Sequence, residues 1–320
     1  MHTRRSFLKT VSIVGGGILT APHVFGFESQ QPSGKKIRFG IISDLHHRQW
    51  GTREEVERLK VFIDTCIEQN PDFIIQCGDL CRSTGAEPLM KEWNRYLGKK
   101  YHVLGNHDMD SSDKPTIMQI WNMEKPYYSF DQGDFHFVVL DRNCIKKEDG
   151  AYIDYASGNW GRHPRKAISH CDAEQLRWLA DDLAKTKKQT LVFMHQPIFL
   201  SDFSDDIGNA NEVLDIFDKA NHAERKAGRP DKVIATFMGH DHDDRYGERN
   251  GVHYFMLNSA TYAYSSGAYF YRDPLFAFVT LDPAGKLIIE GRSSSYNDSV
   301  PEKISSRFPA KISNRDIKLT

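Results

Sequence analysis

The amino-acid sequence predicts an α/β fold, and two patterns indicate it. Short apolar runs are repeatedly followed by segments whose apolar residues recur with helical period, as in strand–helix units. Between Tyr127 and Leu140, two apolar runs flank the polar residues 131–134, which is typical of an antiparallel hairpin. With 320 residues and 39% hydrophobic content, the chain is long enough for one large domain of this kind.

The elements follow one another from Ile37. The first half predicts buried strands over Ile37–Ser43, Phe73–Cys77 and Tyr101–Leu104, and a helix over Thr52–Asn70 that opens on a capping box of Thr52 and Glu55. After the hairpin, the sequence predicts helices over Asp172–Ala184 and Asn211–Ala227, and strands over Leu191–Met194, Val233–Met238, Val252–Leu257, Phe276–Leu281 and Leu287–Gly291. No internal repeat or second linker divides this region, so we expect one domain over residues 37–294.

The two ends of the chain differ from this domain. Residues 1–27 carry Arg4 and Arg5, then the short apolar stretch Val11–Thr20, which is too short for a membrane span of about 20 apolar residues. The paired arginines resemble a bacterial twin-arginine signal and predict export to the periplasm. Residues 28–36 have the composition of a linker, and residues 295–320 are predicted to be a polar, irregular extension. No later segment is apolar enough to span a membrane.

Charge and cysteine content exclude several classes of protein. Lysine and arginine number 42 against 43 acidic residues, so the chain lacks the basic surface of a nucleic-acid-binding protein. Five cysteines cannot all pair, and a protein exported after folding would form its core in a reducing cytosol. We therefore expect free, buried thiols at Cys66, Cys77, Cys81, Cys144 and Cys171.

Five short polar blocks have the residue types of a metal site, and four of them directly follow predicted strands. Strand ends that open into loops are where α/β sheets place ligand-binding groups. Together the blocks offer seven oxygen or imidazole ligands, which is enough for two divalent ions if one carboxylate bridges them. The blocks are Asp44-Leu45-His46, Gly78-Asp79, Gly105-Asn106-His107-Asp108, His195 and Gly239-His240-Asp241-His242.

These five blocks, in this order, resemble the signature of the calcineurin-like metallophosphoesterases from about Ile37 to about Leu281. The resemblance implies a four-layer αββα sandwich with two mixed β-sheets. It also implies that one metal is held by Asp44, His46 and His242, and the other by Asn106, His195 and His240. Asp79 would bridge the two metals, and His107 would face the leaving group.

The chemistry that such a site performs is the hydrolysis of phosphate esters or anhydrides. Two divalent cations about 3.5–4 Å apart can hold a phosphoryl oxygen and lower the pKa of a shared water, which then attacks phosphorus. His107 is suited to protonate the departing alkoxide, and we expect Asp108 to orient its imidazole. Aspartate, histidine and asparagine ligands accept manganese, iron, zinc or nickel, so these residue types do not identify the metal.

Departures from related enzymes favour a small-molecule substrate. Arg82 stands where purple acid phosphatases place a tyrosine, and the block after Gly78 lacks the protein-phosphatase motif. A phosphodiester or pyrophosphate is the favoured substrate, with Trp160 and Arg162 as its predicted contacts in an aromatic-rich loop. Two alternatives stay open: an exported phosphomonoesterase that scavenges phosphate, and a non-catalytic metal-dependent binding protein. The sequence does not indicate an oligomeric state.

Overall fold

The computed structural model describes residues 34–49, 54–201 and 207–319. Residues from Pro32 to Thr320 form one compact unit. The predicted signal, residues 1–27, lies outside the described residues, as does most of the predicted linker.

The first large sheet has the strand order β16-β15-β14-β1-β2-β3. Strands β1, β2 and β3 run parallel, whereas β14, β15 and β16 add antiparallel neighbours on the other side. Its strands are β1 (Ile37–Ile42), β2 (Phe73–Cys77), β3 (Lys99–Val103), β14 (Ala277–Asp282), β15 (Lys286–Gly291) and β16 (Arg315–Lys318).

The second large sheet has the order β10-β11-β9-β8-β5-β4, with β5, β8, β9 and β11 parallel. The predicted hairpin is confirmed as β4 and β5. Its strands are β4 (Tyr128–Gln132), β5 (Phe135–Val139), β8 (Gln189–Phe193), β9 (Val233–Met238), β10 (Arg245–Arg249) and β11 (Val252–Met256). Two small hairpins, β6 (Cys144–Lys146) with β7 (Tyr152–Asp154) and β12 (Tyr262–Tyr264) with β13 (Ala268–Phe270), lie outside these sheets.

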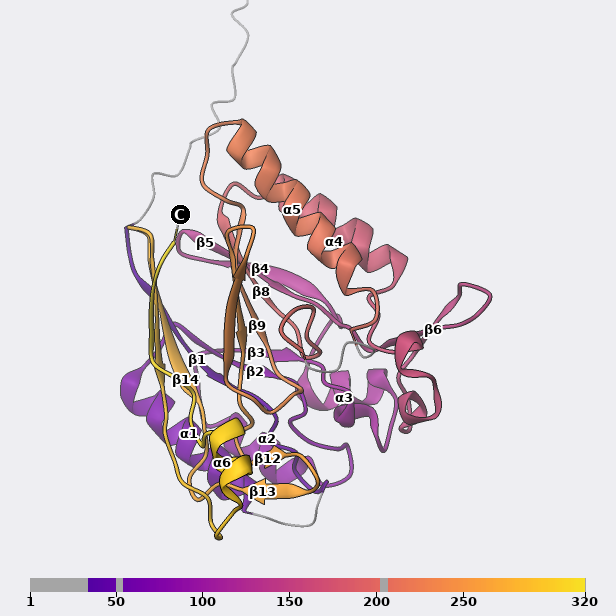
Figure 1. Ribbon diagram of the computed structural model, residues 1–320, viewed down its shortest axis with the longest axis vertical. Helices are drawn as coiled ribbons and strands as arrows, with labels where there is room; N and C mark the ends of the chain where they lie inside the picture. Colours follow the sequence, from indigo (N-terminus) through magenta and orange to yellow (C-terminus); the bar gives the residue numbers. More distant parts are fainter. Residues whose placement is uncertain (1–33, 50–53, 202–206, 320) are drawn as a thin grey trace, which may run out of the picture. The chain divides into compact units, whose positions relative to one another are not determined.

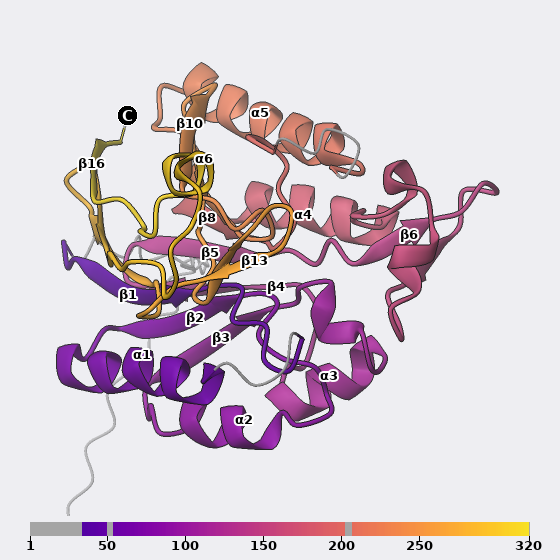
Figure 2. The ribbon, with the colours of Figure 1, turned by 60° about the horizontal axis from the view of Figure 1, so that its bottom comes forward.

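Helices cover the outer faces of both sheets, which confirms the four-layer αββα sandwich. Figure 2 shows α1 and α2 on the side of the first sheet and α4 and α5 on the side of the second. Between the sheets, aromatic rings from both form one apolar layer: Phe39 stacks on Phe73 at 4.8 Å and meets the edges of Phe137, Phe193 and Phe237. The helices are α1 (Glu55–Gln69), α2 (Glu87–Trp93), α3 (Lys114–Trp121), α4 (Ala173–Lys185), α5 (Ala210–Lys226) and α6 (Glu302–Arg307).

The C-terminal residues are not irregular, which corrects the sequence prediction. They form α6 and then β16, whose Ile317 lies opposite Leu287 of β15 at the edge of the first sheet. The edge strand reads Arg-Asp-Ile-Lys, so it carries a single apolar residue and no alternation that the sequence could reveal. Figure 1 shows this segment in yellow, ending at the C-terminus on the side of the molecule that holds β1 and β14.

The start of α1 also differs from the prediction. Glu54 occupies the N-cap with φ 61°, and no side chain caps the helix there. Glu55 does not complete a capping box, because its carboxylate contacts Nδ1 of His47 at 3.2 Å. Thr52 lies outside the described residues. The helix buries Leu59, Phe62 and Ile63.

The cysteines are all buried and free, as expected. Burial raises the pKa of each thiol, as at Cys171, where it reaches about 12, so these side chains are inert packing groups. Within the ranges that the structure describes, no helix is long and apolar enough to cross a membrane.

Phe39 is the side chain whose removal should most directly weaken the contact between the sheets. Phe39→Ala is expected to lower the free energy of unfolding by about 3–5 kcal/mol, because it leaves a cavity among four aromatic rings. Denaturant unfolding measures this, with Leu97→Ala as the control, since Leu97 is 93% exposed. Equal stability of the two variants would contradict the packing described here.

Candidate metal centre

The predicted ligand blocks meet where parallel strands of both sheets end. Asp44 and His46 follow β1, Asp79 follows β2, and Asn106 follows β3. His195 follows β8, and the block of His240 and His242 follows β9. Because β1, β2 and β3 are parallel, as are β8 and β9, their carboxyl ends bring the loops of each sheet together.

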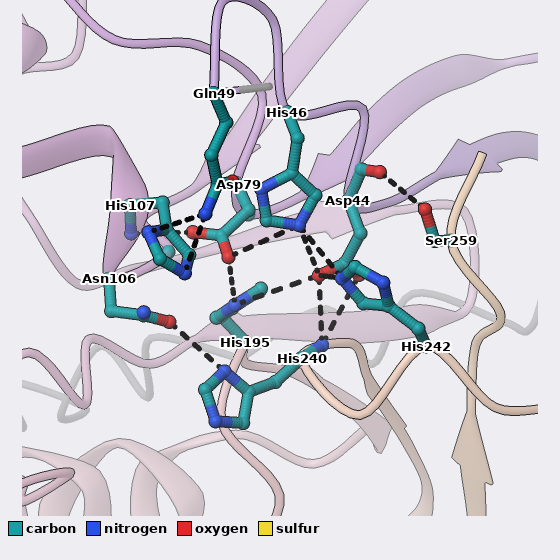
Figure 3. Close-up of polar contacts among 12 residues, drawn as sticks. Asp44, His46, Gln49, Asp79, Asn106, His107, His195, His240, His242 and Ser259 are labelled. Carbon is teal, nitrogen blue, oxygen red and sulfur yellow. Dashed lines mark hydrogen bonds and ion pairs between the residues drawn. The ribbon is translucent and has the colours of Figure 1, made fainter. Parts of the chain in front are cut away.

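One group of ligands consists of Asp44, His46 and His242, all buried. The Nε2 atoms of the two imidazoles lie 2.8 Å apart. Oδ1 of Asp44 lies 3.3 Å from Nε2 of His242 and 3.6 Å from Nε2 of His46. Figure 3 shows these donor atoms converging on one point. This is the set predicted for one metal.

A second group lies beside the first and contains Asp79, His195 and His240. Oδ2 of Asp79 is 3.0 Å from Nε2 of His195, and Nδ1 of His240 is 3.0 Å from Oδ1 of Asn106. The same Asp79 oxygen lies 3.7 Å from Nε2 of His46, which belongs to the first group. Asp79 therefore stands between the two groups, at the position predicted for a bridging ligand.

Hydrogen bonds outside the cluster fix the orientation of two imidazoles. Nδ1 of His195 donates to the carbonyl oxygen of Cys77 at 2.9 Å, and Nδ1 of His242 donates to that of Tyr262 at 3.1 Å. When Nδ1 holds the proton of a neutral imidazole, Nε2 presents its lone pair. Both lone pairs then point into the cluster, as in metal sites whose histidines are held by backbone carbonyls.

The backbone around the ligands is built for close approach. Five ligands have left-handed φ values between 51° and 73°, a conformation in which strained side chains at functional sites are often found. Gly105 and Gly239 leave room for carboxylates, since an added Cβ would lie 2.2 Å from Oδ1 of Asp79 and 2.5 Å from Oδ2 of Asp44 respectively. The five residues are Asp44, His46, Asp79, His240 and His242.

The buried charges of the cluster compensate one another. Burial alone would raise the pKa of Asp44 and Asp79, but the neighbouring imidazoles, His195 first among them, hold both pKa values below the ordinary range. Burial would lower the pKa of His195, but the two carboxylates raise it to about 10. The two carboxylates thus favour the protonated form of the His195 imidazole.

The donor set fits divalent cations. It offers two carboxylates, an amide oxygen and four imidazoles, all of which are ligands of first-row transition metals. Binding of cations would replace the proton on His195, because a ligating imidazole must be neutral.

His107 lies at the rim of this cluster, but its imidazole is not oriented by Asp108 as the sequence suggested. Nδ1 of His107 lies 2.8 Å from Oδ2 of Asp110. Asp108 is fully buried and accepts backbone hydrogen bonds from Asp79, Cys81 and Gly105, at 2.8–3.0 Å. Asp108 thus ties the loop after β2 to the loop after β3.

Burial lowers the pKa of His107, but the charge of Asp79 and the hydrogen bond that the ring donates to Asp110 raise it more, so that the net shift is upward. A protonated imidazole can donate to a departing oxygen. The amide nitrogen of Gln49 lies 3.1 Å from Nδ1 of the same ring. Gln49 and Asp110 were not singled out in the sequence, and only the spacing of three residues between His107 and Asp110 could have pointed to the latter.

The two predicted substrate contacts differ in position. The ring of Trp160 meets His107 edge-on at 5.0 Å, and its Nε1 donates to Oδ1 of Asp110 at 3.2 Å. Arg162 is exposed two residues further on, at the end of a short 3₁₀ helix, Asn159–Arg162. The ring of Tyr262, in β12, packs against the rings of His46 and His242, with centroid distances of 5.3 and 4.7 Å. Trp160 and Tyr262 therefore flank the cluster from two sides.

Known proteins share this fold. A manganese-dependent ADP-ribose/CDP-alcohol diphosphatase from Oryza sativa is 22% identical over 276 residues, which cover 69% of this chain and 83% of that protein. Purple acid phosphatase 22 from Arabidopsis thaliana is 24% identical, but only 38% of its length is covered, against 54% of this chain.

Two solved structures resemble the chain in fold. A dimetal phosphatase from Danio rerio aligns with a TM-score of 0.63 at 15% identity, covering 89% of this chain and 99% of that one. A purple acid phosphatase from yellow lupin aligns with a TM-score of 0.51 at 16% identity, covering 81% of this chain and 52% of that one. The family model for calcineurin-like phosphoesterases matches residues 37–244, the part of the chain that supplies every ligand described above, and the chain belongs to this family.

Proposed function

We propose that this phosphoesterase hydrolyses a small phosphodiester or pyrophosphate and that it uses two divalent cations. The observation that carries the proposal is the convergence of seven candidate ligand side chains, with Asp79 between the other six and His107 beside them. In the assignment that we favour, Asp44, His46 and His242 hold one cation, and the other is held by Asn106, His195 and His240. Asp79 serves both cations.

The cations, when bound, would supply Lewis-acid charge to the phosphoryl oxygens and activate water. The chain supplies the remaining parts. His107 gives its proton to the oxygen that leaves phosphorus, and Asp110 holds the imidazole at Nδ1, so that Nε2 is the donating atom. The two carboxylates are buried and pack closely against Gly105 and Gly239, which keeps them from moving during the reaction.

A small substrate is supported by the site and by one relative. The relative from Oryza sativa is named for the hydrolysis of ADP-ribose and CDP-alcohols, both of which carry a nucleotide. Trp160 stands beside His107 with a partly exposed ring, which could stack on a planar group of such a substrate. The similarity to a purple acid phosphatase supports a second candidate function for this chain, that of a phosphomonoesterase.

A substrate panel tests this proposal. With Mn²⁺ present, we expect bis(p-nitrophenyl) phosphate and ADP-ribose to be hydrolysed with a larger kcat/KM than p-nitrophenyl phosphate. A preference for the monoester would replace our proposal by the scavenging phosphatase. If no substrate were hydrolysed while two cations were bound per chain, the protein would be a metal-dependent binding protein instead.

His107→Gln tests the proton donor. General acid catalysis contributes roughly 10²–10⁴-fold, so we expect kcat for an alkyl phosphodiester to fall by about 10² or more, while metal content stays unchanged. The loss should be much smaller with bis(p-nitrophenyl) phosphate, because nitrophenolate leaves without protonation. His253→Gln is the matched control, since His253 is a buried histidine on β11 whose imidazole contacts Tyr246 and Glu248 of β10, and it belongs to none of the ligand blocks. An equal loss with both leaving groups, or loss of metal, would show that His107 is not the acid.

A further inference from the structure

Arg82 lies in the same small cavity as the metal ligands, yet nothing in the proposed hydrolysis uses it. Its side chain lines this cavity together with His46, Gln49, Asp79 and His107. One Nη atom donates to Oδ2 of Asp110 at 2.9 Å, and the side chain is 33% exposed. Its Nε is buried and has no hydrogen-bond partner in the described part of the chain.

The position of Arg82 relative to His107 is fixed by one carboxylate oxygen. Oδ2 of Asp110 accepts from Arg82 and also lies 2.8 Å from Nδ1 of His107. The guanidinium therefore lies on the same side of the metal ligands as the imidazole. Since His107 is proposed to protonate the leaving group, Arg82 faces what the leaving group carries beyond its departing oxygen.

The guanidinium of Arg82 is suited to bind an anionic group of the substrate. Arginine keeps its charge at all relevant pH values, and its planar guanidinium binds phosphate oxygens with two parallel hydrogen bonds. An alcohol released from a simple diester carries no charge for the Arg82 guanidinium to bind, whereas a phosphate leaving group does.

We propose that Arg82 binds a second phosphoryl group of the substrate, and that the chain therefore prefers organic pyrophosphates to esters with one phosphorus atom. This inference rests on the proposed phosphoesterase activity. In the reaction, a water oxygen bonds to one phosphorus and the bridging P–O bond breaks. The bond's electron pair stays on the leaving phosphate, His107 supplies it with a proton, and the proton released from water returns to solvent. Two phosphomonoesters result, with water as the only co-reactant.

Asp110 is a positioning residue in this account. Its second oxygen, Oδ1, accepts from Nε1 of Trp160 at 3.2 Å. One carboxylate therefore positions the guanidinium of Arg82, the imidazole of His107 and the indole of Trp160. A nucleoside diphosphate derivative has matching parts: a phosphate that leaves, its negative charge, and a planar base. Through Asp110, the positions of Arg82, His107 and Trp160 together favour nucleoside diphosphate derivatives as substrates.

The test compares two substrates in one variant. A hydrogen bond to a charged group corresponds to roughly 10- to 100-fold in a rate or binding constant, so Arg82→Gln should lower kcat/KM for ADP-ribose by that factor. The loss for bis(p-nitrophenyl) phosphate, which has one phosphorus atom, should be at least about tenfold smaller. The selective loss should appear mainly in KM, and Arg82→Lys should recover part of it, because lysine keeps the charge but not the paired hydrogen bonds.

Arg95→Gln is the matched control, because Arg95 forms a comparable pair with Asp64 and has a similar exposure, 38%, outside the cavity. It should leave both substrates unchanged. Equal losses for the two substrates in Arg82→Gln, with metal content and Tm preserved, would overturn the role of Arg82. If unmodified protein with bound Mn²⁺ hydrolysed neither substrate, the proposed function itself would fail, which is a different result.

Discussion

Two carboxylates, Asp44 and Asp79, are buried at the ends of neighbouring strands, and the rest of the site depends on compensating their charge. An isolated buried carboxylate costs several kcal/mol, so it requires cations or hydrogen-bond donors around it. The backbone N–H groups of His240 and His107 donate to them, and the imidazole of His195 carries a raised pKa beside them. Divalent cations would compensate the two buried negative charges more completely. This cluster of carboxylates and imidazoles is therefore typical of a metal centre.

The fold makes that concentration possible because its two sheets contribute different ligands. Asp44 and Asp79 come from the first sheet and His195 and His240 from the second, so the carboxylates meet the imidazoles only when the sheets pack correctly. The aromatic layer between the sheets supplies that packing. Stability and site geometry are therefore coupled: the apolar interior holds the sheets at the spacing that the polar cluster needs.

The sequence predicted the strands and the ligand blocks because both leave local patterns, namely apolar runs and polar residues directly after them. It did not predict how side chains turn in the short 3₁₀ helix from His107 to Met109. There, residues three apart lie on one side, so Asp110 rather than Asp108 reaches the His107 ring. Gln49 leaves no local pattern, and β16 pairs through its backbone, so neither could be found from residue types alone.

The metal content of Asp79→Asn tests the central claim, that one buried carboxylate serves both cation sites. Unmodified protein and the control Asp231→Asn, which alters a buried carboxylate that pairs with Arg225 outside the ligand blocks, should each bind two Mn²⁺ per chain by elemental analysis. Asp79→Asn should lose affinity for both ions, because the carboxylate oxygen beside His195 also lies near His46. Two tightly bound ions per chain in Asp79→Asn would contradict the account.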